Sequence, residues 1–296
     1  MSELDTFISD GWQQHADDPA GVAQRLPSGL GKVHDESGLV SLAQLAHHVY
    51  GEHLAAWNDG LKFLAALGRL PPFDAQGHSG QTLLRLRASL ALAAGEGDAR
   101  GTLSPSDRIR VGAMAAASLA GHDTARATAL FQESLEEARS ADLPASDPMN
   151  RALAVTGNNL ACTLEEKIGR TAQERELMIL AARTGRHYWE RAGTWLETER
   201  AEYRLAMTWL QAGDPVQARQ HAQQCLEIVS AQAEPPALER FFAWEALGVV
   251  ERAGGNPTGH QRALAAAREA FERLDEGDRG WCAAELEKLA APTAGA

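Results

Sequence analysis

The chain has 296 residues, with 40 acidic against 28 basic side chains and a net charge of −12. Because a negative surface repels phosphate backbones, we expect no nucleic-acid partner. A chain of this length can bury enough apolar surface without disulfides or a structural metal, and its three cysteines lie far apart, as is typical of buried thiols. The acidic N-terminus and the lack of a long apolar run predict a cytoplasmic protein without a membrane partner.

Apolar residues recur at helical spacing, and prolines and glycines separate the stretches in which they do so. We expect an N-terminal helical or flexible segment at 1–36 and a disordered tail at 292–296. The helices predicted between them lie at 37–50, 54–67, 79–95, 105–120, 124–141, 148–168, 171–185, 187–212, 215–231, 236–253, 258–275 and 278–290. Prolines near several of these starts support the boundaries, since proline fits the first turn of a helix. No strand pattern appears, and the arrangement within 69–104 stays open.

Short connections between helices predict an all-α fold of antiparallel hairpins. The segment 199–228 carries a large–small pair, an aromatic residue one turn later, a glycine turn and then spaced small residues: Leu205, Ala206, Trp209, Gly213, Ala218, Ala222, Cys225 and Leu226. This pattern resembles the tetratricopeptide repeat, a helix–turn–helix of about 34 residues. The resemblance implies a right-handed α-solenoid over 37–291, with about five hairpins and a C-terminal capping helix at 278–290.

Two asparagines lie inside the predicted helix 148–168 although asparagine has low helix propensity. Their presence there therefore suggests a role other than helix formation. If Asn158 and Asn159 face the concave groove that the resemblance implies, their carboxamides can bind the backbone of a peptide ligand. The alternative is that they tie neighbouring helices together. Applying the same register to the other hairpins adds polar and apolar residues to the groove, and the set that we expect to bind a partner is Asn158, Asn159, Tyr203, Arg204, Met207, Glu166, His47 and His48, with Phe242 and Glu245 from the last hairpin.

The sequence AHHVYGEH contains His47, His48, Glu52 and His53. Histidine and glutamate four residues apart share one helix face at a spacing that metal ligands use. The spacing is nevertheless neither HExxH nor HxxEH, and Gly51 can interrupt the helix. We therefore expect no metal and no cofactor, although a metal site completed by His15, His78 or His122 is an alternative.

No phosphate-binding loop, nucleophile elbow or cysteine–histidine motif occurs in the sequence. The mixed charges of 197–204 predict solvated faces and surface ion pairs. We therefore expect a non-enzymatic scaffold that binds a protein or peptide partner in its groove, and a homodimer is allowed. The alternatives are a regulator that senses a peptide or small molecule and a metal-dependent enzyme at the histidine cluster.

Overall fold

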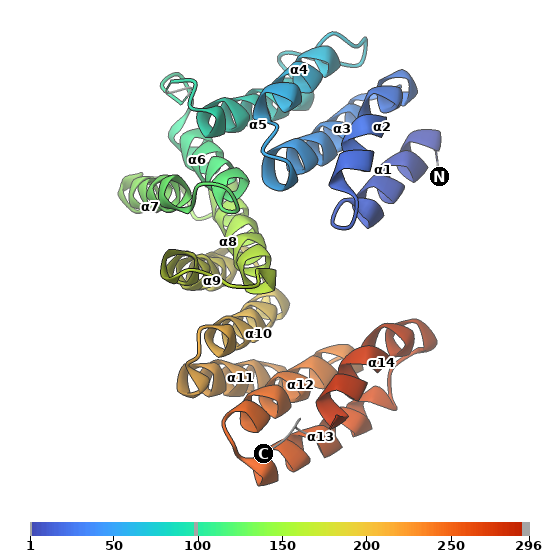
Figure 1. The fold of residues 1–296 in the computed structure, drawn as a ribbon, viewed down its shortest axis with the longest axis vertical. Helices are drawn as coiled ribbons and strands as arrows, with labels where there is room; N and C mark the ends of the chain where they lie inside the picture. The colour runs from blue at the N-terminus through green and yellow to red at the C-terminus, as the bar shows by residue number, and fades with distance from the viewer. Residues whose placement is uncertain (1, 98–99, 292–296) are drawn as a thin grey trace. The chain divides into compact units, whose positions relative to one another are not determined.

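The structure is a computed structural model that describes residues 2–97 and 100–291. Every regular element in these residues is helical, as the sequence predicts, and the helices pack mainly against their neighbours along the chain (Figure 1). The predicted tail at 292–296 lies outside the described residues. No helix in the described part of the chain is both long and apolar enough to cross a bilayer.

The contacts divide the chain into two compact units, residues 1–152 and 153–296, a division that the sequence does not indicate. The first unit contains α1 (Glu3–Gln14), α2 (Pro19–Gly29), a short 3-10 turn η1 (Leu30–Lys32), α3 (Glu36–His48), a π-helical turn η2 (Val49–His53), α4 (Trp57–Leu67), α5 (His78–Ala94), α6 (Pro105–Leu119) and α7 (Thr124–Ser140). The second contains most of α8 (Pro148–Glu166), followed by α9 (Ala172–Ala192), α10 (Trp195–Gln211), α11 (Pro215–Ser230), α12 (Ala237–Ala253), α13 (Pro257–Phe271) and α14 (Glu276–Ala290).

Local capping explains where these helices begin. Asp18, Asp123, Asp214 and similar residues accept hydrogen bonds from the first backbone amides of the helices that follow them. The helices α8, α11 and α13 each start with proline, as expected. In the first unit, α1 and α2 belong to the same apolar core as α3, α4 and α5, so the first 29 residues are part of that unit's packing.

One predicted helix boundary is wrong. The sequence suggested a break at Gly185, but α9 continues through it to Ala192, and α10 starts only after Thr194. The hydroxyl and amide of Thr194 form a reciprocal capping box with Glu197, which fixes the real boundary. Gly185 has a packing role instead, where α9 crosses α8.

At this crossing, two glycines let the helix backbones touch. A Cβ added at Gly157 of α8 would lie 2.6 Å from the carbonyl oxygen of Ala181 and 2.7 Å from the amide nitrogen of Gly185. Both neighbours are backbone atoms of α9, so a rotamer change cannot relieve the overlap. The close approach of α8 and α9 therefore requires glycine at position 157.

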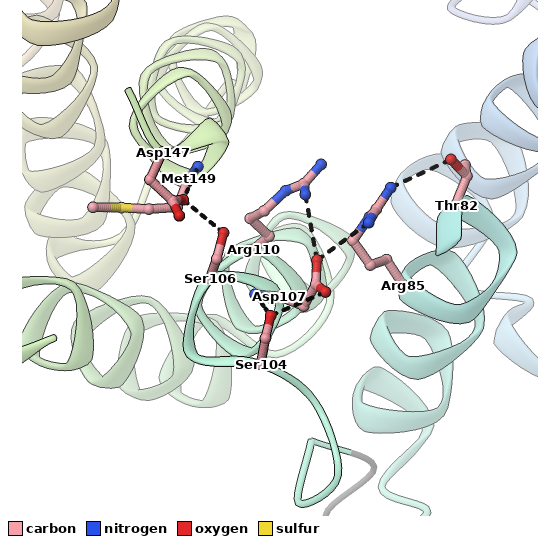
Figure 2. A network of polar contacts seen from close by, with 8 residues as sticks. All are labelled: Thr82, Arg85, Ser104, Ser106, Asp107, Arg110, Asp147 and Met149. Atoms are coloured by element: carbon pink, nitrogen blue, oxygen red, sulfur yellow. Dashed lines mark hydrogen bonds and ion pairs between the residues drawn. The ribbon is translucent and has the colours of Figure 1, made fainter. Parts of the chain in front are cut away.

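In the first unit, Asp107 at the start of α6 links this helix to α5. Arg85 of α5 and Arg110 of α6 both donate to its Oδ1, at 3.2 and 3.3 Å (Figure 2). Beside it, Asp147 accepts hydrogen bonds from the Ser106 hydroxyl at 2.6 Å and from the backbone amide of Met149. These contacts hold α5, α6 and the start of α8 together within the unit.

We predict that Gly157→Ala lowers the free energy of unfolding by more than about 2 kcal/mol, because the new methyl group overlaps backbone that cannot rotate away. Urea unfolding followed by circular dichroism measures the change. Gly280→Ala is the matched control: nothing lies within 4 Å of its new Cβ, and alanine in this helix interior gains up to about 1 kcal/mol. Equal stability of the two variants would contradict the proposed contact.

We also predict that Asp107→Asn destabilises the chain by about 1–3 kcal/mol, because two neighbouring guanidinium groups lose their shared counter-charge. Arg85 is only 10% exposed in this pair, so water compensates poorly. Asp59→Asn makes the same chemical change in an exposed pair with Lys62, and thermal unfolding should barely detect it. The prediction fails if both substitutions have the same small effect.

Candidate functional site

A cavity of about 520 Å³ lies between α8, α10, α12 and α14 in the second unit. The helices on its two sides differ in what they contribute. α10 supplies charged residues and a tyrosine, whereas α12 and α14 supply mainly apolar and aromatic groups. The complete lining is Asn158, Glu199, Arg200, Tyr203, Arg204, Leu238, Glu239, Phe242, Trp281 and Glu285.

Three aromatic rings follow one another along the cavity. The Tyr203 and Phe242 rings meet edge to face with centroids 5.9 Å apart, and Phe242 lies 5.2 Å from Trp281. Trp281 is 65% exposed, which is unusual for a side chain of this size in a packed helical unit. The row therefore offers a ligand an accessible apolar surface.

Both arginines of the lining are held by carboxylates. Arg204 donates to Glu165 at 2.5 Å, and Thr208 hydrogen-bonds the other oxygen of that carboxylate. Arg200 pairs with Glu239 at 2.7 Å. The largely buried pair with Glu165 holds the Arg204 guanidinium in place, whereas the Arg200 side chain is 60% exposed and is held less firmly.

Two buried carboxyl groups near the cavity have no arginine or lysine partner within ion-pair distance in the described residues. Burial raises the pKa of Glu199 to about 7, even though the Cys225 thiol donates to it at 2.9 Å. Burial also raises the pKa of Glu245 to about 7, against the effect of a 3.0 Å hydrogen bond from the Tyr203 hydroxyl. Both groups are therefore poised to change charge near neutral pH.

The structure brings together four of the residues expected to form a groove, namely Asn158, Tyr203, Arg204 and Phe242. Asn158 donates from Nδ2 to Asn159 at 3.2 Å, and its Oδ1 has no partner among the described residues. Asn159 is exposed beside the cavity and does not line it. Whether these residues bind a ligand remains a prediction.

The other predicted residues lie elsewhere. Met207 is half-buried against the apolar cluster between α10, α11 and α12, and Glu166 is exposed at the end of α8. His47 is buried in the first unit and hydrogen-bonded to Ser89 at 2.7 Å. Burial lowers its pKa to about 4, so the ring is neutral and part of the core.

Sequence reasoning missed Trp281 and Glu199. The sequence predicts only a capping helix around Trp281, and the exposure of its side chain in the structure reveals an available surface. The mixed charges around Glu199 and Glu202 predict solvated side chains, but both are buried, and Glu202 binds Arg186 and His221. Glu199 lies four residues before Tyr203, and Glu202 lies one residue before it, so both are on inward faces of α10. The alternating charges of this segment hide that spacing in the sequence.

A second polar cluster lies in the first unit, where His48 meets two other histidines. Its Nε2 is 3.1 Å from Nε2 of His53, and its Nδ1 is 3.0 Å from Glu52. His15, which follows α1, stacks near both rings with centroid separations of 4.9 and 5.1 Å. Partial burial and the neighbouring imidazoles lower the pKa of His53.

The π-helical turn η2 brings these residues together. Its widened ring closes with a hydrogen bond from the Leu54 amide to the Val49 carbonyl, five residues back. In an α-helix, residues five apart point in different directions, but the wider turn stacks them on one side. Gly51 continues the turn instead of ending the helix, and a Cβ there would lie 2.8 Å from the Ser118 hydroxyl and 3.0 Å from Leu90.

A scan against protein-family models found no match to the chain. A search of curated proteins likewise found no relative. Function is therefore inferred from the geometry of the cavity and of the histidine cluster.

We predict that the second unit loses stability between pH 5 and pH 8. Glu199 and Glu245 hold protons in the folded state that the unfolded chain releases above its ordinary pKa of about 4.5. Their stabilising effect is full below that pH and disappears as pH rises through about 7, at a cost on the order of 2 kcal/mol each.

Urea unfolding followed by tryptophan fluorescence checks this, because most tryptophans lie in the second unit. The Glu199→Gln/Glu245→Gln variant should flatten the pH profile between pH 5 and 8. Glu166→Gln, which changes an exposed carboxylate, should leave the profile as in the wild type. An unchanged slope in the double variant would contradict the assignment.

Proposed function

We propose that the chain is a non-enzymatic binding protein that holds a segment of a partner polypeptide in the cavity of its second unit. The observation that carries the proposal is the meeting of Asn158, Tyr203 and Arg204 with the exposed ring of Trp281 around one cavity. In this proposal the chain is related to tetratricopeptide proteins, and α10 and α11 form one repeat of its solenoid. The burial of Ala206, Ala218 and Ala222 between them supports that relation.

The chemistry of the lining suggests what the segment looks like. The free Oδ1 of Asn158 accepts a backbone amide, a contact independent of the ligand's side chains. The rings of Phe242 and Trp281 take an apolar or aromatic side chain, which is the usual anchor of an interface. When ionised, Glu199 and Glu245 make this region negative, which favours a basic residue beside that anchor.

The volume of the cavity also fits a small organic ligand, since such sites measure roughly 300–1,000 Å³. This second candidate corresponds to a regulator that senses a small molecule. An organic amine with an aromatic group would satisfy both the rings and the carboxyl groups. The same variants test either occupant.

Peptides that bind the full-length chain can be selected from a random twelve-residue library. We predict that these peptides bind the Trp281→Ala variant at least about tenfold more weakly, because the substitution removes the exposed anchor surface. The same loss should follow Asn158→Ala. Asn58→Ala is the matched control, because it removes the same group from an exposed site in the other unit. Fluorescence anisotropy measures the dissociation constants, and circular dichroism checks the fold.

Peptides that bind Asn158→Ala, Asn58→Ala and Trp281→Ala equally well would place the binding surface elsewhere and refute the proposal. If no peptide is selected, a thermal-shift screen with aromatic amines tests the second candidate. Stabilisation that disappears in Trp281→Ala would then support a small-molecule site. If no peptide is selected and no aromatic amine stabilises the chain, both candidate functions are refuted.

A further inference from the structure

The histidine cluster of the first unit has the arrangement of a metal site. Each of His15, His48 and His53 presents one ring nitrogen, and these atoms all lie within 4.8 Å of one another. The three rings come from the end of α1, the end of α3 and the end of the π turn. All three are partly buried, and the Trp12 ring packs on His15 and His48 at 5.3 and 5.2 Å.

The hydrogen bonds at the far sides of two rings orient their lone pairs toward the centre. A carbonyl oxygen can only accept, so the contact of His15 Nδ1 with the Trp12 carbonyl places the proton on Nδ1. The Glu52 carboxylate does the same for Nδ1 of His48. In its neutral form, each of these two rings therefore carries its lone pair on Nε2. Such contacts to a carbonyl and a carboxylate are those that orient histidine ligands in metal sites.

The third ring occupies the position of a ligand as well. Nε2 of His53 lies 3.1 Å from Nε2 of His48 and donates its proton to that lone pair in the metal-free cluster. Two imidazole nitrogens bound tetrahedrally to zinc at about 2.0–2.1 Å are about 3.4 Å apart. The observed separation is close to that value. The His15 ring nitrogen, which lies within 4.8 Å of the other two, has to move closer to complete the set.

We propose that His15, His48 and His53 bind one divalent transition-metal ion of the zinc class through their Nε2 atoms. The His53 proton moves to its Nδ1 when the metal takes its place, so all three ligands stay neutral. Glu52 is a positioning residue that acts through His48. His47, which the sequence grouped with this cluster, is excluded because its Nε2 is bound to Ser89. This proposal differs from the expectation of a metal-free protein that the sequence suggests, and it does not depend on the cavity in the other unit.

Three protein ligands leave a fourth tetrahedral position open. Nitrogen ligands of intermediate softness suit Zn²⁺, Co²⁺, Ni²⁺ and Cu²⁺ and disfavour Mg²⁺ and Ca²⁺, which prefer oxygen. Because Co²⁺ adopts the same geometry as Zn²⁺ and absorbs visible light, it serves as the probe.

The test is a titration of the chelator-treated full-length chain with Co²⁺, followed by visible absorption and by displacement with Zn²⁺. We expect one equivalent to produce the intense bands of a four-coordinate ion, and Mg²⁺ to have no effect. His15→Ala, which changes a residue beyond the end of α1, and His53→Ala should abolish the bands. Glu52→Gln keeps every ligand and should weaken binding by 10- to 100-fold.

His34→Ala is the matched control, because this exposed histidine of the same unit lies outside the cluster. It should bind Co²⁺ as the wild type does. Circular dichroism confirms that each variant is folded. Absence of the bands in the wild type, or their persistence in both folded cluster variants, overturns the proposal.

Discussion

The close approach of helix backbones is the constraint on which the second unit depends. Where α8 crosses α9, Gly157 leaves no room for a side chain against the backbone of its neighbour. Buried alanines such as Ala206 and Ala218 also allow α10, α11 and α12 to pack closely, although their methyl groups keep the backbones further apart than glycine does. With few large side chains to fill space, dense packing is reached by moving helices together, because any remaining gap would forfeit dispersion contacts. The residues that we propose for binding lie where this packing stops, at the row of rings that ends with the exposed Trp281.

Close packing also buries ionisable groups. In the two units such groups make stability depend on pH in opposite directions. The second unit holds carboxyl groups that prefer to be protonated, as at Glu199, whereas the first holds a neutral imidazole at His47. The stabilising effect of a buried neutral histidine is present above pH 6.5 and disappears as pH falls toward about 4. A fall in pH below about 6.5 therefore weakens the first unit through His47, whereas a rise in pH through about 7 weakens the second through Glu199.

The helical class and most helix starts could be predicted from sequence because proline, capping residues and apolar spacing act locally. The boundary at Gly185 could not, because a glycine that ends a helix and one that allows two helices to touch look the same without the neighbour. Asn158 and Arg204 were identified from a repeat register, but Trp281 was not, since exposure depends on what the rest of the unit covers. His15 was also only one of several candidates, because its place beside His48 results from the folding of α1 onto α3.

The π turn after α3 has a consequence for how such a chain can change over time. A ring closed five residues back contains one residue more than an α-helical turn, so removal of a single residue between Val49 and His53 converts it to ordinary helix. Every later residue of the turn would then rotate by about 100° around the helix axis. Gain or loss of one codon is thus enough to assemble or scatter the imidazoles, with no substitution at any of them. Among related chains, length between α3 and α4 is more informative about this cluster than the presence of histidine.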